Sequence, residues 1–190
     1  MKIGLFFGSF NPIHIGHLII GNLAVETTDL EQVWYVVSPQ NPFKKQNQLL
    51  HEFDRLAMVE RAIADNYKLK ASDVEFHLPK PSYTIDTLTY IQEKFPQHQF
   101  SLIMGSDNLA KLHKWKNYEQ ILAYFHLLVY PRPEATQTPF DNHPKVRIVE
   151  APLLDISATF IRQCIRNKQS IRYLVPESVE QFIQLHKFYL

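Results

Sequence analysis

The chain has 190 residues, 45% of them hydrophobic and 13% aromatic, which is enough for one core but not for two large domains. Lys plus Arg number 20 and Asp plus Glu 19, so the net charge of +1 favours neither nucleic acid nor a membrane as partner. The single cysteine, Cys164, excludes an internal disulfide and fits a cytoplasmic protein, here expected to be one domain over residues 1–190.

Strand and helix patterns alternate along the chain. Short apolar runs predict buried strands over 3–7, 32–37, 73–76, 100–104, 126–130 and 146–149. Helical spacing predicts helices over 15–26, 52–64, 84–94, 118–124, 159–167 and 176–187. This alternation indicates an α/β fold with a doubly wound parallel sheet and a small C-terminal helical portion.

Two details of this pattern can be checked against the structure. The helix over 52–64 is expected to turn one apolar face to the core, formed mainly by Phe53, Leu56, Ala57, Val59, Glu60 and Ile63. The segments 38–50 and 131–145 are polar or proline-rich, which predicts surface loops. In α/β enzymes such loops often contribute to the site.

The first informative motif runs from Gly8 to His17 and reads Gly-Ser-Phe-Asn-Pro-Ile-His-Ile-Gly-His. It follows the first predicted strand and opens the first helix, where free N–H groups and the helix dipole suit a phosphate. His14 and His17 are three residues apart, so both are expected to face the same way and to donate hydrogen bonds to phosphoryl oxygens. Four of the five glycines lie in the first 21 residues, which predicts close approach to the backbone there.

Other interpretations of this motif are weaker. The chain contains neither the lysine-bearing P-loop pattern nor the three-glycine dinucleotide-binding pattern. A metal-binding histidine pair remains an alternative, but no nearby cysteine or carboxylate completes a ligand set, and we predict no metal bound by the protein itself. A lone histidine is usually structural, whereas two at this spacing after a Gly-Ser turn favour a site.

A second motif, residues 156–162, reads Ile-Ser-Ala-Thr-Phe-Ile-Arg. Ser157 is expected to cap the helix that begins here. Arg162, one turn into that helix, presents a forked donor set that matches phosphate oxygens. An ordinary capped helix with an exposed arginine is the competing interpretation of this segment.

Together the two motifs resemble those of the nucleotidyltransferase superfamily that carries a His/Thr-x-Gly-His signature. The second segment is similar to the superfamily's Ile-Ser-Ser-Thr-x-Ile-Arg pattern, from which Ala158 departs. The resemblance implies a Rossmann-like nucleotidyltransferase fold with catalytic His14, His17 and Arg162. It also implies an ATP site formed by Gly8, Ser9, Phe10, Gly16, Ser157 and Thr159.

Further segments narrow the resemblance to bacterial nicotinate mononucleotide adenylyltransferases. These are residues 81–88, 104–108, 112–118 and 130–133. The family resemblance implies that Thr84, Asp107, Trp115, Lys44 and Arg132 bind the nicotinate nucleotide. A helix start near Thr84 would attract the carboxylate and Trp115 would stack on the pyridine ring, although a tryptophan is more often core and Asp107 could simply cap its helix. Lys44 and Lys45 could neutralise phosphate or belong to a solvated loop.

The implied reaction moves AMP from ATP onto the phosphate of nicotinate mononucleotide. That phosphate is already nucleophilic, so catalysis is expected to rest on positioning and charge stabilisation, with Mg²⁺ carried mainly by the ATP phosphates. The alternatives are nicotinamide mononucleotide as acceptor, a pantetheine-phosphate adenylyltransferase, and a nucleotide-binding regulator without turnover. Partners are expected to be these substrates alone, with no nucleic acid or membrane, and a homo-oligomer stays open.

Overall fold

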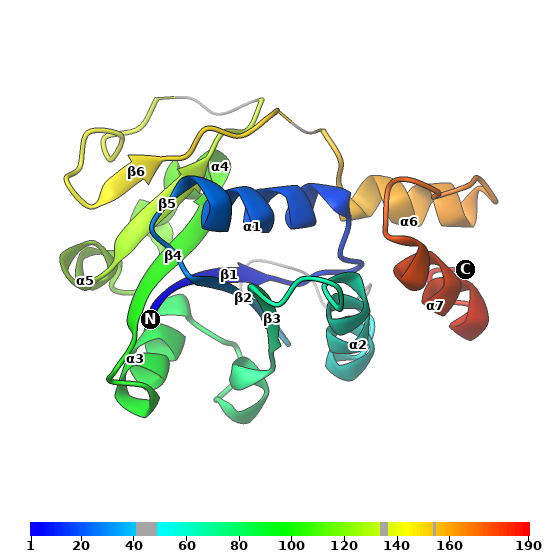
Figure 1. Cartoon of the computed structure of the whole chain (residues 1–190), viewed down its shortest axis with the longest axis horizontal. Coiled ribbons are helices and arrows are strands. Elements are labelled where there is room, and N and C mark those ends of the chain that lie inside the picture. Colours follow the sequence, from blue (N-terminus) through cyan, green and yellow to red (C-terminus); the bar gives the residue numbers. More distant parts are fainter. Residues whose placement is uncertain (41–48, 134–136, 154) are drawn as a thin grey trace.

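A computed structural model of the chain describes residues 1–40, 49–133, 137–153 and 155–190. Within these residues the chain folds around one parallel sheet that has helices on both faces (Figure 1). The prediction of an α/β fold with a doubly wound parallel sheet is confirmed.

The sheet has six strands in the described part of the chain, in the order β3-β2-β1-β4-β5-β6, and every neighbouring pair is parallel. The strands are β1 (Lys2–Gly8), β2 (Gln32–Val37), β3 (Leu69–Ser72), β4 (Gln99–Gly105), β5 (His126–Tyr130) and β6 (Val146–Ile148). The strand order reverses between β1 and β4. In open sheets of this kind, ligands bind in the crevice beyond the carboxyl ends of the strands at such a reversal.

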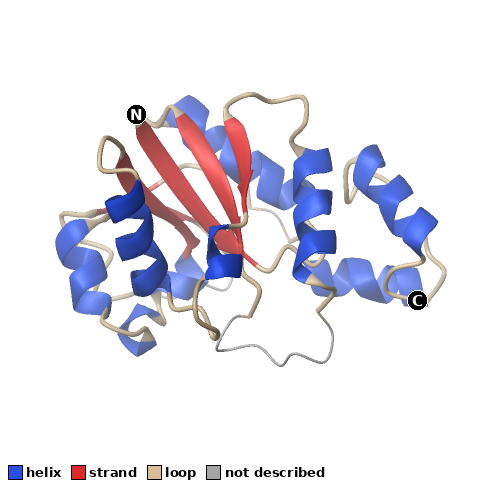
Figure 2. Ribbon diagram, turned by 90° about the horizontal axis from the view of Figure 1, so that it is seen from below, coloured by secondary structure: helices blue, strands red, loops and turns tan. Residues whose placement is uncertain are grey.

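Helices cover both faces of the sheet. They are α1 (Ile15–Thr27), α2 (Glu52–Ala62), α3 (Thr84–Lys94), α4 (Ser106–Leu109), α5 (Tyr118–Tyr124), α6 (Ala158–Arg166) and α7 (Glu177–His186), with the short 3-10 helices η2 (Val74–His77) and η3 (Leu112–Lys114). Figure 1 places α1 on one side of the sheet and α3 on the other. Figure 2 shows α7 and the C-terminus at one end of the molecule, which confirms the predicted C-terminal helical portion.

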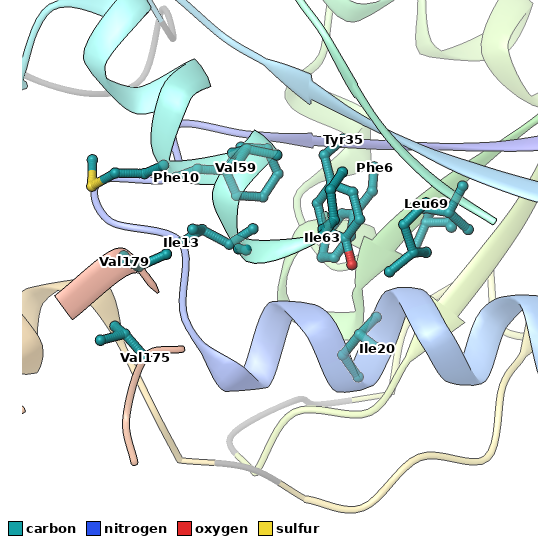
Figure 3. Close-up of a cluster of buried hydrophobic side chains, with 14 of the residues drawn as sticks. Phe6, Phe10, Ile13, Ile20, Tyr35, Val59, Ile63, Leu69, Val175 and Val179 are labelled. Carbon is teal, nitrogen blue, oxygen red and sulfur yellow. The ribbon is translucent and has the colours of Figure 1, made fainter. Parts of the chain in front are cut away.

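Two clusters of buried hydrophobic side chains stabilise this arrangement. One joins the sheet to α1, α2, α6 and α7, and the other joins it to α3 and α5. Figure 3 shows the first cluster, in which Phe6 and Tyr35 come from neighbouring strands, Ile20 from α1, Val59 from α2 and Val179 from α7. The C-terminal helices therefore share a core with the segment that follows β1.

The predicted strand over 73–76 is wrong. The third strand lies earlier, at Leu69–Ser72, and the predicted segment forms η2 instead. Val74 and Phe76 flank a polar residue and so imitate strand alternation, but that residue, Glu75, is itself only 2% exposed. The real strand was missed because its sequence, Leu-Lys-Ala-Ser, has only one large apolar side chain.

The predicted apolar face of α2 is also partly wrong. Arg55, Met58, Val59 and Ala62 are buried, whereas Phe53 is 58% exposed. Periodicity counts an arginine as a surface residue, so the helix was expected to be turned differently about its axis. The fully buried Arg55 has a specific role near the site, described below.

Candidate active site

The two histidines of the first motif lie together at the start of α1. His14 is the N-cap residue, and its ring stacks on that of His17 with centroids 3.7 Å apart and planes inclined by 28°. The backbone N–H of His14 donates to Nδ1 of His17 over 3.3 Å. With Nδ1 as acceptor, a neutral His17 carries its proton on Nε2 and can present it to a ligand oxygen. The prediction that both rings face the same way is confirmed.

His14 is almost fully enclosed, with 3% of its surface exposed. Burial, and after it the positive charge of Arg132, lowers the pKa of His14 to about 4. The imidazole is therefore neutral near pH 7 and carries a single N–H. A neutral donor of this kind can bind a phosphoryl oxygen without adding a charge to the site.

The first N–H group of α1 is not free, contrary to the sequence-based expectation. The backbone N–H of Ile15 donates over 2.9 Å to the carbonyl of Leu174, which lies between α6 and α7. A distant part of the chain thus satisfies one of the donors that a helix start usually offers to an anion. The turn therefore offers a ligand fewer free backbone N–H groups than the motif alone predicts.

The second motif meets the first across the end of the sheet. Ser157 caps α6 by accepting a hydrogen bond from the backbone N–H of Phe160 over 3.2 Å, as predicted. Arg162 donates from Nη1 to the backbone carbonyl of Asn11 over 2.8 Å and from Nη2 to Oγ1 of Thr159 over 3.2 Å. Residues 151 positions apart are thereby joined at one point.

A pocket beside the histidines joins parts of both motifs. It is lined by the N-cap residue His14, by Gly16 and His17 of α1, by Ile156 before α6 and by Arg132 after β5. Although the family resemblance implies that Arg132 binds the acceptor, the structure places it on the histidine side. Its Nε lies 4.0 Å from Oδ1 of Asp107, an exposed residue in the first turn of α4. Gly105 is the N-cap residue of that helix, so Asp107 does not cap it.

Tyr35 holds the backbone of the histidine turn. It is fully buried, and its hydroxyl donates to the carbonyl of His17 over 3.0 Å. The contact requires glycine on α1, because a Cβ at Gly21 would lie 2.0 Å from the Tyr35 hydroxyl oxygen. The predicted close approach at a glycine is therefore real here, although the approaching group is part of the protein itself.

Phe10 packs in the core and lines neither this pocket nor the larger cavity described next. It is 2% exposed, with its ring edge-on to that of His17 at a centroid distance of 5.1 Å. Its neighbours in sequence, Gly8 and Ser9, do face the larger cavity. The resemblance placed all three in the nucleotide pocket, whereas the structure gives Phe10 a supporting position under a histidine.

A cavity of about 430 Å³ opens on the other side of this turn. Its lining includes Thr84 from the start of α3 and Trp115 from the end of η3, two residues that the resemblance implies for the acceptor. Trp115 is half-buried and packs against the second core cluster, so one part of it is anchored while another borders the cavity. The volume falls in the range of small-molecule sites.

Lysines give the cavity a positive border. Lys111, Lys114 and Lys116 line it. Lys116 is paired with Asp86 at 2.8 Å, whereas neither Lys111 nor Lys114 forms an ion pair with another described residue. Lys111 was not predicted from the sequence. Its spacing of three residues from Lys114 was the available signal, because residues three apart on a helical turn lie on the same side. The predicted Lys44, with its neighbour Lys45, lies outside the described residues.

The cavity lining includes a buried carboxyl group, that of Glu75. Oε1 of Glu75 accepts a hydrogen bond from Oγ1 of Thr87 over 2.8 Å, and Oε2 has no hydrogen-bond partner among the described residues. Burial raises the pKa of Glu75, and the hydrogen bond from Thr87 opposes that shift in part. Since Thr87 lies one turn inside α3, this contact attaches the helix start to η2. Glu75 was missed because the segment imitates a strand.

Arg55 organises the loops that border the cavity. Its guanidinium donates from Nη1 to the carbonyls of Ser9 at 2.6 Å and Ser38 at 2.8 Å, from Nη2 to Pro39 at 3.2 Å, and from Nε to Leu50 at 2.9 Å. One side chain therefore fixes the segments after β1 and β2 and the start of α2. A buried charge is expensive unless it is hydrogen-bonded, and these four contacts use four of the five N–H groups of the guanidinium.

The parts of the chain that the structure describes contain no group of three or more His, Cys, Asp or Glu side chains arranged for a metal ion. In those same parts, no helix is long and apolar enough to span a bilayer.

This combination of fold and site defines a class of protein. A family model described as cytidylyltransferase-like matches residues 5–164, which is most of the chain. The chain therefore belongs to the cytidylyltransferase-like family.

More specific relatives share the whole length of the chain. It is 64% identical over 189 residues to a probable nicotinate-nucleotide adenylyltransferase of Cytophaga hutchinsonii, covering 100% of this chain and 98% of the relative. It is 54% identical to a relative of the same description from Flavobacterium psychrophilum, covering 100% and 99%.

A solved structure supports the fold independently. Nicotinic acid mononucleotide adenylyltransferase of Plasmodium falciparum, complexed with NaAD, superposes with a TM-score of 0.85, covering 99% of this chain and 97% of the other. With 20% sequence identity, this likeness supports the fold alone.

Proposed function

We infer that the protein is a nicotinate-nucleotide adenylyltransferase. It transfers AMP from ATP to nicotinate mononucleotide, giving nicotinate adenine dinucleotide and pyrophosphate in NAD biosynthesis. The observation that carries this function is the meeting of the two motifs at Asn11, beside a cavity of acceptor size at the strand-order reversal. The full-length relatives described as probable nicotinate-nucleotide adenylyltransferases support the same acceptor.

The ATP side performs the chemistry. A phosphate oxygen of the acceptor attacks the α-phosphorus in line, the bond to the bridging oxygen breaks, and pyrophosphate leaves with that electron pair. His14 and His17 donate N–H groups to phosphoryl oxygens, and Arg162 neutralises the leaving group. Ser157, Thr159 and Gly16 border the triphosphate. Preorganised donors aimed at developing charge are the main source of rate enhancement in such a site.

The acceptor side performs recognition. Trp115 stacks on the pyridine ring, and the N–H groups at the start of α3, near Thr84, bind the carboxylate. Lys111 and Lys114 attract the acceptor phosphate. Arg132 lines the pocket on the histidine side, with Asp107 4.0 Å away, and can orient the phosphate that is about to react.

We propose that Mg²⁺ enters on the phosphates of ATP. The donor set fits that role, because the described residues near the histidines offer Asp107 as an isolated carboxylate and form no cage of protein ligands. Bound in this way, the ion would neutralise charge on the leaving pyrophosphate. We also propose a cytoplasmic location, which suits Cys164 as a buried free thiol.

The function is tested by incubating the purified protein with ATP, Mg²⁺ and nicotinate mononucleotide. Pyrophosphate and the dinucleotide should form in equal amounts, and neither should form when the acceptor is omitted. Phosphopantetheine in place of the mononucleotide should give no product. ATP binding without pyrophosphate release would instead favour a regulator.

A further inference from the structure

Asn11 is the point at which four segments of the chain meet. It is 4% exposed and lies in the turn between β1 and the histidines. Its backbone carbonyl accepts the hydrogen bond from Arg162 over 2.8 Å. Its side-chain Oδ1 accepts from the hydroxyl of Tyr189 over 2.9 Å and from the backbone N–H of Leu50 over 3.3 Å. Arg162 is thus bonded to a residue whose side chain is held by Tyr189 and Leu50.

Tyr189 is the next-to-last residue of the chain, beyond the end of α7. It is half-buried and packs against the first core cluster. Its φ of 66° lies in the left-handed region, which a bulky residue seldom adopts. Burial raises the pKa of its hydroxyl, so the group stays protonated and remains a donor. The end of the chain is therefore held in a specific conformation that aims this hydroxyl at Asn11.

The C-terminal portion holds this turn at other points as well. The carbonyl of Leu174 accepts from Ile15 at the start of α1. Ile13, between Asn11 and His14, belongs to the same buried cluster as Val175 and Val179 (Figure 3). These contacts set the general position of the turn. The hydroxyl of Tyr189 acts on a single residue. It fixes the side-chain amide of Asn11, whose backbone carbonyl accepts the hydrogen bond from Arg162.

We propose that Tyr189 is a positioning residue for adenylyl transfer, acting through Asn11 on Arg162. This role rests on the proposed function of Arg162 in binding ATP phosphates. Without the hydroxyl, Oδ1 of Asn11 loses the shorter of its hydrogen bonds from Tyr189 and Leu50, and the turn can shift together with the guanidinium. The effect should fall on ATP and leave the acceptor cavity unchanged, because Tyr189 does not line it.

The test variant is Tyr189→Phe, which keeps the packed ring. Its matched control is Tyr173→Phe on the same C-terminal portion, where the side chain is exposed and makes no hydrogen bond to a described residue. We expect Y189F to raise the KM and the dissociation constant for ATP by roughly three- to tenfold, the equivalent of one lost hydrogen bond. The KM for nicotinate mononucleotide and both constants of Y173F should equal those of the wild type. All assays run below the lowest thermal midpoint of the variants.

A double-mutant cycle with Arg162→Lys separates positioning from simple packing. If Tyr189 acts through Arg162, Y189F should add little once Arg162 has been replaced, since the two effects share one pathway. Effects that multiply would overturn the proposal, as would a Y189F enzyme with wild-type ATP constants, whether or not it is less stable. ATP binding by calorimetry needs no turnover. A wild type that binds ATP but makes no product removes the proposed function, and the ATP dissociation constants of the variants still decide whether Tyr189 positions Arg162.

Discussion

The two sides of the site differ in how their polar groups are held. On the ATP side His14 and Asn11 are buried, and both of these residues and Arg162 contact other parts of the protein. On the acceptor side the cavity is open, and Lys111 and Lys114 at its border are exposed. The polar groups of the first side are held by contacts within the protein, whereas these two lysines form no ion pair with a described residue.

This difference follows from the two tasks. A transition state differs from the substrate by fractions of an ångström, so groups that stabilise it must already be in place. Recognition of an acceptor tolerates mobile side chains, because contacts form once the ligand is bound. Substitutions on the ATP side should therefore change turnover, and substitutions around the cavity should change acceptor affinity and choice.

The largest effect is expected from His17→Ala. Losing one preorganised donor should lower kcat roughly a hundredfold or more, with little change in the KM for the acceptor. Steady-state kinetics on the purified variant measure both constants. His126→Ala is the control, since His126 is exposed at the opposite, amino end of β5. Wild-type turnover by a folded H17A enzyme would remove His17 from the chemistry.

A smaller loss is expected from Arg162→Lys. The ammonium keeps the charge but cannot make the two bonds to Asn11 and Thr159, so kcat/KM for ATP should fall roughly tenfold. Arg166→Lys on the exposed end of the same helix should have no effect. Equal kinetics for the two lysine variants would show that Arg162 has no specific contact with ATP.

The acceptor side offers a pH-dependent test through Glu75. Burial raises its pKa in the folded protein, so its protonated form favours folding, and that contribution is lost as pH rises through the folded-state pKa. Glu75→Gln should therefore have a higher thermal midpoint than the wild type at pH 8, and a smaller advantage near pH 4. Each kcal/mol of added unfolding free energy corresponds to a rise of roughly 2–4 °C in that midpoint. Thermal unfolding of both proteins measures this, with Glu93→Gln, exposed on α3, as control. A difference between E75Q and wild type that does not change with pH would contradict the shift. Protonation of His14 at low pH affects the stability of both proteins, so its effect cancels in the difference between E75Q and the wild type.

The sequence predicted the sheet and most helices because their apolar periodicity is regular. The predictions for α3, α5, β2 and β5 match the structure at both ends. The two motifs also identified the residues that meet at the turn. Both kinds of signal are local, so each can be recognised without knowing what surrounds it.

Two of the failures come from a buried polar side chain, and a third from a backbone N–H that is bonded to a distant part of the chain. Arg55 changed the expected face of α2 in part, because its partners are carbonyls of other loops. Glu75 made η2 resemble a strand. The hydrogen bond from the N–H of Ile15 could not be foreseen, since its acceptor, the carbonyl of Leu174, lies far away in the sequence. Long-range hydrogen bonds leave no periodicity to read.

The central claim is that the acceptor is nicotinate mononucleotide, and a comparison of acceptors tests it most directly. The two candidate mononucleotides differ only at the carboxylate or amide of the ring, and we expect the choice between them to arise from the N–H groups near Thr84. An amide placed against those donors leaves one buried group unpaired, at about 1–3 kcal/mol, and lacks the anion's charge. Stacking on Trp115 does not distinguish the two rings.

The measurement is kcat/KM for nicotinate and nicotinamide mononucleotides with saturating ATP, in the wild type and in Trp115→Ala. The wild type should prefer the nicotinate form by more than about tenfold. Trp115→Ala should lose activity with both acceptors and keep that ratio. Equal use of the two acceptors by the wild type would contradict the claim.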